Sequence, residues 1–406
     1  MLKHNYCVLG WEPGLGKSIA SLAVAVKTGG TTIVVCPPFL SLNWYAEIKK
    51  WIPDAVISLF KRGKDIYFPV DSDFIIIPYT MVDKGKHIFK CADTVIADEA
   101  HMVKNMETIR TEALHDAVFD YQPKRLILAT GTPIKNRVVE FYSLLVLCGY
   151  IPRPDNGLNA ARIYPTLDHF ADEFSFSRLV RLPNGMRVKK YFGVKNVDKL
   201  KKLLKGKYLR RLSKEELDLS EPIFKDYLAK NTNDKSLQKE WEEFQKSSKD
   251  KVDSSAKAKS ALAKVKYTIE YVENLFEEGL DKVIIYSDHV QPVHLIAEHF
   301  GVPHITGAVD SDVRFHIAQK FESGETKVLV ATLESFSTGI NLTTCCNTVF
   351  NDLSWIPATN SQAIGRTLRI GQTRPVIIHR VLGSKQDVNI VKSLRSKEYV
   401  IDQAVN

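Results

Sequence analysis

The stretch of sequence that decides the fold is Val95-Ile96-Ala97-Asp98-Glu99-Ala100-His101. In it, an apolar run leads directly into two consecutive carboxylates. A short apolar run rich in β-branched residues predicts a buried strand. At the carboxyl end of such a strand, Asp98 can hold a magnesium ion and Glu99 can polarise an attacking water as a general base. A surface acidic turn is the simpler alternative. A glycine-rich loop roughly 80 residues earlier argues against that alternative.

The glycine-rich loop follows the strand-like run 6–9 and reads Gly14-Leu15-Gly16-Lys17-Ser18. Glycines let backbone N–H groups wrap a phosphate, and the first turn of a following helix adds favourable partial charge. We therefore expect Lys17 to reach the outer phosphates of a nucleotide and the Ser18 hydroxyl to hold magnesium. Trp11 stands where the strict phosphate-loop pattern has a glycine, so a chance Gly-Lys-Ser turn stays an alternative.

A third motif, Thr130-Gly131-Thr132-Pro133, follows the apolar run 126–129. Two hydroxyls around a glycine can link a nucleotide site to a neighbouring surface. On these residues alone a generic turn explains the motif equally well.

The fourth motif is the stretch 362–372, Gln-Ala-Ile-Gly-Arg-Thr-Leu-Arg-Ile-Gly-Gln. Its two arginines, Arg366 and Arg369, are three residues apart and are expected to share one helix face. Two cations on one face can enter a phosphate site together, as arginine fingers do. The alternatives are a basic helix that grips a DNA backbone and plain solvent exposure.

Short β-rich runs alternate with helical patterns in two parts of the chain. The runs are 6–9, 32–36, 74–78, 94–97 and 125–129, and then 282–287, 304–306, 327–331, 348–351 and 376–381. Buried runs that alternate with helices predict parallel sheets in an α/β fold. We therefore expect two α/β lobes, residues 1–149 and 275–406. Between them, the charged segment 150–274 predicts a helical insertion and linker, whose polar part 231–259 is an exposed helical hairpin or a partly mobile linker.

Charge and cysteine usage narrow the classes of partner. The net charge is +9, which suits a polyanion such as nucleic acid, although a solvated lysine-rich surface would give the same balance. No apolar run reaches the length of a membrane span, so we expect no membrane partner.

The cysteines argue against zinc, because none of the six forms a Cys-x-x-Cys pair. Their low density indicates a reducing interior without a disulfide framework.

In this order, the four motifs resemble those of superfamily two helicases with a DEAH box, here Asp98-Glu99-Ala100-His101, and specifically the Swi/Snf-like DNA translocases. The resemblance covers nearly the whole chain. Its most family-specific element is the ending Arg369-Ile370-Gly371-Gln372, where RNA helicases of the DEAH kind usually differ. Further matches are Cys36-Pro37-Pro38, Pro78-Tyr79-Thr80, Lys104-Asn105, Thr132 to Arg137, Gly339 to Leu342 and Asp352 to Trp355.

The resemblance implies two RecA-like lobes and an enzyme that hydrolyses ATP to ADP and phosphate with Mg²⁺ while it moves on DNA. Lobe 1 would bind ATP through Gly14, Leu15, Gly16, Lys17 and Ser18, with Ser18 and Asp98 on the metal. The catalytic residues would be Lys17, Asp98, Glu99, Arg366 and Arg369, with Gln362 near the nucleotide. DNA would lie along Ser41, Thr80, Ser287, Thr332 and Asn341, held mainly through its phosphate backbone. The adenine-reading glutamine motif of the family has no counterpart in this sequence, so either a longer chain carries it or adenine is held otherwise.

Within the family, the chain looks most like the compact annealing-helicase branch, because of the segment 263–271 before the run 282–287 and the stretch 209–212. That branch acts on forked or branched DNA in repair, replication and recombination. The choice between unwinding, annealing and branch migration stays open. So do an RNA helicase, a motor subunit of a restriction or repair complex, and a non-motor nucleic-acid-binding module. We expect a monomer inside the cell, in the cytoplasm if the source is bacterial or viral and in the nucleus if it is eukaryotic.

The tryptophans and the middle basic run have two interpretations each. Trp44, Trp51 and Trp355 can stack on bases, but at amphipathic spacing they fit lobe-core anchors better. The run 199–211 can touch DNA phosphates or form a solvated helix face. We hypothesise that the segment 150–274 directs the motor to forks.

Overall fold

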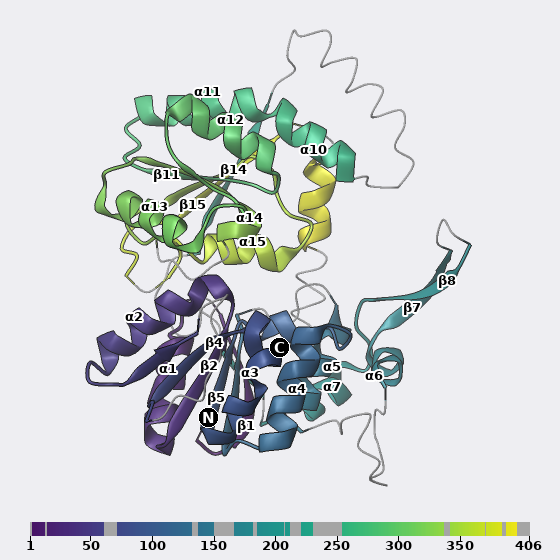
Figure 1. Cartoon of the computed structure of the whole chain (residues 1–406). Helices are drawn as coiled ribbons and strands as arrows, with labels where there is room; N and C mark the ends of the chain where they lie inside the picture. Colours follow the sequence, from purple (N-terminus) through teal and green to yellow (C-terminus); the bar gives the residue numbers. More distant parts are fainter. Residues whose placement is uncertain are drawn as a thin grey trace. The chain divides into compact units, whose positions relative to one another are not determined.

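The computed structural model describes residues 2–12, 14–60, 71–131, 137–149, 166–181, 185–206, 208–211, 221–229, 254–336, 342–369, 371–383 and 387–395. They fall into two compact units that divide between Glu216 and Leu217 (Figure 1). Each unit is built on its own parallel sheet, so the predicted pair of α/β lobes is confirmed. The division, however, lies inside the segment 150–274, which we predicted to be a separate insertion.

The sheet of the first unit has seven strands in the order β3-β4-β2-β5-β6-β1-β9, and every neighbouring pair is parallel. The strands are β1 (Tyr6–Trp11), β2 (Thr31–Cys36), β3 (Ile57–Leu59), β4 (Phe74–Pro78), β5 (Ala92–Asp98), β6 (Arg125–Ala129) and β9 (Tyr208–Arg211). All five residues of β4 are buried, as expected for a parallel strand with both faces covered. The five strands predicted from apolar runs are all present.

Helices cover both faces of this sheet. They are α1 (Lys17–Thr28), α2 (Ser41–Trp51), α3 (Val82–Gly85), α4 (Ile109–Tyr121), α5 (Phe141–Leu147), α6 (Leu167–Phe174) and α7 (Val197–Leu204), with 3-10 turns η1 (Pro38–Leu40), η2 (Tyr79–Met81), η3 (Lys86–Cys91), η4 (Ala100–Val103) and η5 (Val138–Glu140). Side chains alternate along β1, so that Cys7 and Leu9 pack with α1 and α2 while Val8 packs with α3 and α4.

The edge strand β9 packs tightly on β1, the strand that leads into the glycine-rich loop. Leu209 lies opposite Leu9, and Arg210 lies opposite Gly10. A Cβ atom at Gly10 would come within 2.2 Å of Cε2 of Tyr208, so only glycine leaves room for that ring. A strand from the middle of the chain thus completes the sheet beside the glycine-rich loop.

The second unit has a six-stranded sheet in the order β10-β15-β14-β11-β13-β12, with all neighbouring pairs parallel. Its strands are β10 (Ile223–Leu228), β11 (Val283–Ser287), β12 (His304–Ile305), β13 (Val328–Thr332), β14 (Asn347–Phe350) and β15 (Ile377–Leu382). Its helices are α10 (Ser254–Ala263), α11 (Val265–Glu277), α12 (Val290–Phe300), α13 (Ser311–Ser323), α14 (Leu333–Phe336) and α15 (Pro357–Ile364). One face packs on α11 and α12 and the other on α13 and α15.

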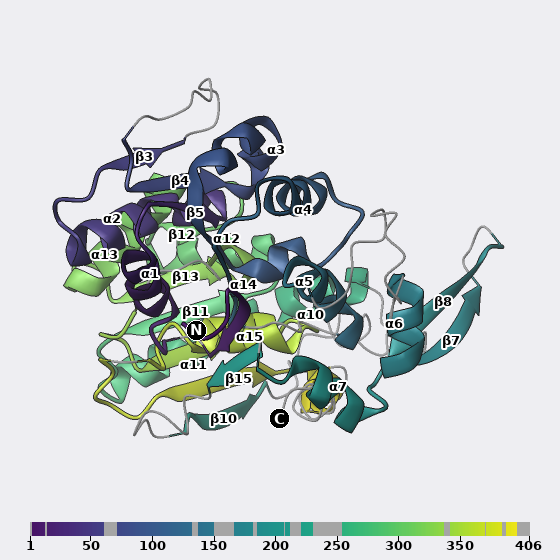
Figure 2. The same ribbon diagram turned by 90° about the horizontal axis from the view of Figure 1, so that it is seen from below.

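The described residues of the segment 150–274 include the helices α6, α7 and α10 and most of α11, but they do not form a separate insertion. The segment also supplies β9 to the first sheet and β10 to the second. It also forms an antiparallel hairpin of β7 (Phe176–Arg181) and β8 (Arg187–Phe192), which follows α6 in Figure 2. The basic run 199–211 is part helix (α7) and part strand (β9). Residues 231–253 of the polar stretch lie outside the described residues.

In the described part of the chain, no helix is long and apolar enough to cross a membrane. The six cysteines are free thiols, and all except the half-buried Cys91 are buried.

Candidate functional site

The glycine-rich loop leaves the carboxyl end of β1 and enters α1 with an unusual backbone. Gly14 and Gly16 have φ angles of 87° and 77°, a region that side chains other than glycine rarely adopt. Gly16 is the residue before α1 and carries no side-chain cap, and Lys17 is the first helical residue. Leu15 is buried and anchors the loop, while Ser18 is half-buried in the first turn. The loop therefore brings backbone N–H groups and a helix N-terminus together, which suits a phosphate.

Lys17 folds back over this loop. Its ammonium donates to the carbonyl oxygens of Trp11 at 3.0 Å and Glu12 at 3.2 Å. Both carbonyls belong to the residues that lead into the loop, so the ammonium of Lys17 lies against the loop itself. The role of Lys17 on the outer phosphates stays a prediction.

Asp98 ends β5, and it accepts three hydrogen bonds, two at its buried carboxylate and one at its backbone oxygen. The Trp44 indole N–H of α2 donates to its Oδ2 at 2.9 Å, and the Glu99 amide donates to its Oδ1 at 2.9 Å. The Tyr79 hydroxyl donates to its backbone oxygen at 2.8 Å. Trp44 is thus the core residue that we expected, whereas the same expectation is wrong for Trp51, which is 51% exposed. Trp44 also orients an acid. That second role was not predicted, because the two residues are 54 positions apart.

Burial and the adjacent Glu99 carboxylate raise the pKa of Asp98 to about 6, while the Trp44 N–H and the Lys17 charge oppose the rise. The positive charge near the Asp98 carboxylate therefore does not fully offset the cost of burying its ionised form. A divalent cation would supply the missing positive charge, because cations favour the ionised form of a carboxyl that they contact. The Asp98 carboxylate and the hydroxyl of Ser18 in the first turn of α1 are oxygen ligands of the kind that Mg²⁺ takes together with nucleotide phosphates. The residues present thus fit a magnesium site.

Glu99 lies at the head of a chain of polar groups. Its backbone has a φ of 50°, which turns the chain sharply after β5. Nδ1 of His101 lies 3.1 Å from Oε2 of Glu99 and 3.3 Å from the hydroxyl oxygen of Thr130. The Thr130 amide in turn donates to the Leu9 oxygen of β1 at 3.1 Å. These contacts therefore link the ends of β5, β6 and β1, which are neighbours in the sheet, with β6 in the middle.

The structure describes only the first part of the third motif. Thr130 contacts the acidic pair through His101, whereas Thr132 to Asn136 lie outside the described residues. We did not predict His101 as a residue of the site. Its position two residues after Glu99 in the stretch 95–101 is the sequence feature that could have indicated this role.

In the second unit, the expectation that Arg366 and Arg369 share a helix face is wrong. Helix α15 ends at Ile364, and both arginines lie in the turns that follow. Gln362 and Arg366 are buried, and Arg369 is half-buried. The Leu342 amide donates to the Arg366 oxygen at 3.0 Å, which ties the turn to the segment before β14.

Gln372 holds the same region together. Its side-chain amide donates to the carbonyl oxygens of Thr343 at 3.1 Å, Cys345 at 2.8 Å and Thr367 at 3.3 Å. The final glutamine of the fourth motif therefore clamps the turn that carries the two arginines.

The residues expected along DNA lie in different environments. Thr80 is exposed, and Asn341 is outside the described residues. Ser41, Ser287 and Thr332 are buried. Their hydroxyls contact Cys36 at 3.7 Å, Asp352 and Ser335, respectively. The assignment to a DNA track thus stays a prediction, and for these three hydroxyls the observed partners are protein atoms.

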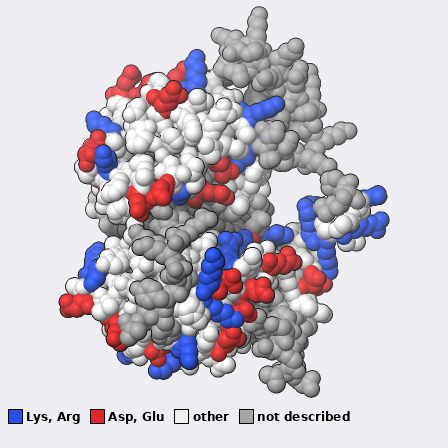
Figure 3. Space-filling model, viewed as in Figure 1, with Lys and Arg blue, Asp and Glu red and all other residues white. Residues whose placement is uncertain are grey.

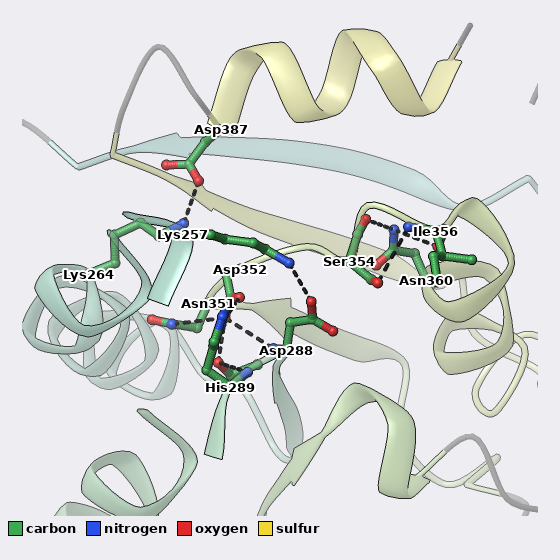
Figure 4. A network of polar contacts seen from close by, with 11 residues as sticks. Lys257, Lys264, Asp288, His289, Asn351, Asp352, Ser354, Ile356, Asn360 and Asp387 are labelled. Atoms are coloured by element: carbon green, nitrogen blue, oxygen red, sulfur yellow. Dashed lines mark hydrogen bonds and ion pairs between the residues drawn. The ribbon is translucent and has the colours of Figure 1, made fainter. Parts of the chain in front are cut away.

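The Ser287 contact belongs to a polar network at the ends of β11 and β14 (Figure 4). Asp352 also contacts His289 at 3.0 Å, and Lys257 pairs with Asp288. Lys264, in the turn between α10 and α11, pairs with Asp387 at 2.9 Å. Although burial opposes ionisation, the His289 hydrogen bond and the charges of Lys264 and Lys257 hold the pKa of Asp352 below its ordinary value.

Comparisons with known proteins cover most of the chain. The model of the SNF2-related domain matches residues 2–275, and that of the helicase conserved C-terminal domain matches residues 263–371. A SWI/SNF-related matrix-associated actin-dependent regulator of chromatin subfamily A-like protein 1 of Xenopus tropicalis is 26% identical over 99% of this chain and 43% of its own length. The DNA annealing helicase and endonuclease ZRANB3 of Bos taurus is 25% identical over 94% of this chain and 37% of its own length.

The chain thus spans less than half the length of these curated relatives. Among solved structures, the Sulfolobus solfataricus SWI2/SNF2 ATPase core in complex with dsDNA is 22% identical, with a TM-score of 0.43 over 97% of this chain and 87% of that one.

The raised pKa of Asp98 predicts a pH-dependent stability. Because the folded pKa of about 6 lies above the ordinary value of 3.8, its contribution is fully present below pH 4 and is lost as pH rises through 6. Without nucleotide or magnesium, the wild type should therefore lose about 2 kcal/mol relative to Asp98→Asn between pH 4 and pH 7. Urea unfolding of both proteins across this range measures the difference. A difference that does not change with pH would contradict the assignment.

Proposed function

Because the chain belongs to the family that carries the SNF2-related domain, we propose that it is an ATP-dependent DNA helicase or translocase that remodels forked or branched DNA. The observation that carries the proposal is one sheet edge. There, Thr130 after β6 is hydrogen-bonded to Leu9 of β1, the strand that leads into the glycine-rich loop, and to His101, which also contacts Glu99 of the acidic pair after β5. Ligands of open parallel sheets bind at the carboxyl ends of the strands.

In this proposal, the residues from Gly14 to Ser18 hold the ATP phosphates, with Lys17 on the outer ones. Magnesium, when bound through Ser18 and Asp98, neutralises charge that develops on the phosphates. Glu99 takes the proton of the attacking water, and His101 orients its carboxylate. Trp44 and the Glu99 amide fix the Asp98 carboxylate in one orientation, so that little reorganisation is needed when ATP binds.

Arg366 and Arg369 are proposed to stabilise the charge of the transferred phosphoryl group, with Gln362 near the nucleotide. Their support is the matched helicase C-terminal domain, which covers all three residues, and the turn that Gln372 clamps. A rigid turn suits an arginine finger, because its cation must be in place before the reaction.

Forked or branched DNA is the proposed substrate for two reasons. One of the similar proteins is named a DNA annealing helicase and endonuclease, and the net charge of +9 suits a polyanion. Backbone contacts alone would make binding largely independent of sequence. The proposal includes a monomer that works inside the cell. An RNA helicase and a subunit of a restriction or repair complex are the alternatives, and ATPase rates with RNA and with single-stranded, duplex and forked DNA side by side separate the first of them.

Glu99→Gln should abolish turnover without abolishing ATP binding. The substitution keeps the size of the side chain and removes the base, so we expect the DNA-stimulated rate to fall roughly 10²-fold or more. ATPase assays and nucleotide titration of the same preparation measure both properties. Near-normal turnover in this variant would remove Glu99 from the mechanism.

Arg366→Ala and Arg369→Ala test the second unit. A true arginine finger should lower kcat on the order of 10³-fold. Binding of ATP, measured at equilibrium, should change much less. A variant that loses only DNA affinity and keeps its maximal rate would identify that arginine as a phosphate clamp for DNA.

A further inference from the structure

The β7–β8 hairpin of the first unit carries cations that face one another. Arg178 lies directly opposite Lys190, and Arg181 lies directly opposite Arg187. All four are exposed, and Figure 3 shows lysine and arginine gathered on this hairpin. Like charges that are directly opposite in an antiparallel pair destabilise it. Within the described residues, no ion pair involves any of the four. The hairpin therefore holds uncompensated positive charge that an anionic partner would relieve.

Two aromatic rings share one face of the hairpin with the first cation pair. Phe176 lies opposite Phe192, and residues two apart along a strand point to the same face, which places both rings beside Arg178 and Lys190. The rings are 51% and 48% exposed, with centroids 6.1 Å apart. The Arg178 guanidinium lies 6.0 Å from the centre of the Phe192 ring. This face therefore combines exposed aromatic rings with cations that form no ion pair in the described residues.

The opposite face fastens the hairpin to the body of the unit. The Tyr191 hydroxyl donates to Asp168 at 2.8 Å, and Lys189 pairs with Asp172, both on α6. Helix α6 is itself packed into the core through Phe170 and Phe174. The face with the phenylalanines is thus presented by a rigid support, which suits a binding surface better than a loop would.

We propose that this face, formed by Phe176, Arg178, Lys190 and Phe192, binds an unpaired nucleic-acid strand. Cations that track phosphates and aromatic rings that stack on bases are the two elements of single-strand recognition. In a duplex the base faces are already stacked, so the phenylalanines have no partner there. An acidic protein surface would satisfy the cations alone. The inference deepens the proposed function, on which it rests, because a fork offers both duplex and unpaired strand.

Equilibrium binding of labelled oligodeoxythymidine, without ATP, tests the proposal on the full chain. Arg178→Gln with Lys190→Gln should weaken binding about tenfold and make the log–log salt dependence shallower by about 1.4, the loss of two phosphate contacts on a single strand. The matched control is Lys84→Gln with Lys90→Gln, which removes two exposed charges from α3 and η3 of the same unit. This control should leave binding within about twofold of wild type. An equal loss in the control would show a general charge effect and overturn the proposal.

The rings are tested separately from the charges. Phe176→Leu with Phe192→Leu keeps apolar packing and removes stacking, so binding of the single strand should weaken about tenfold, while binding of a matched duplex should change little. Phe176→Tyr with Phe192→Tyr keeps the rings and should bind normally. Unchanged single-strand binding in the leucine variant, or an equal loss for duplex, would overturn the proposal. These assays need no hydrolysis, so wild-type protein without DNA-stimulated ATPase would refute the proposed motor and leave the hairpin result standing.

Discussion

The buried carboxylate of Asp98 is the interaction on which the rest of the first unit depends. An ionised carboxylate out of water is costly, and hydrogen-bond donors must offset that cost. Here the donors come from α2, through Trp44, and from the turn after β5, while Tyr79 of η2 holds the backbone of the same residue. Helix α2, the 3-10 turn and the acidic pair are therefore fixed relative to one another through one residue, Asp98.

Each unit has an aspartate near the end of a central strand, and the pKa values of these two aspartates are shifted in opposite directions. In the second unit, Asp352 follows β14 and is surrounded by His289, Lys257 and Lys264, so its pKa is low and its charge is compensated inside the protein. In the first unit, Lys17 offsets only part of the cost, and the pKa of Asp98 stays high. The magnesium that we propose for the first unit would supply the positive charge that Asp98 lacks and that Asp352 already receives from its neighbours.

The structural features that depend on local composition could be predicted from the sequence. All ten strands expected from apolar runs are present, because a strand buried on both faces must be continuously apolar. The four strands β7 to β10 were missed, since charged residues interrupt them and the run 199–211 has a helical charge pattern. The loop and acidic pair were found as motifs. Their supports, the Trp44 indole and the His101 ring, depend on long-range contacts that no local pattern contains. The end of α15 at Ile364, just before Gly365, was likewise misplaced.

The fluorescence of Trp44 tests the central claim most directly, because its indole N–H is bonded to the carboxylate proposed to meet magnesium. The measurement is the difference in emission between wild type and Trp44→Phe during titration with a non-hydrolysable ATP analogue. We predict a change in the Trp44 signal that requires magnesium together with the analogue and is lost in Asp98→Asn. Nucleotide binding with no Trp44 signal, or a full signal that persists without magnesium or in Asp98→Asn, would contradict the account.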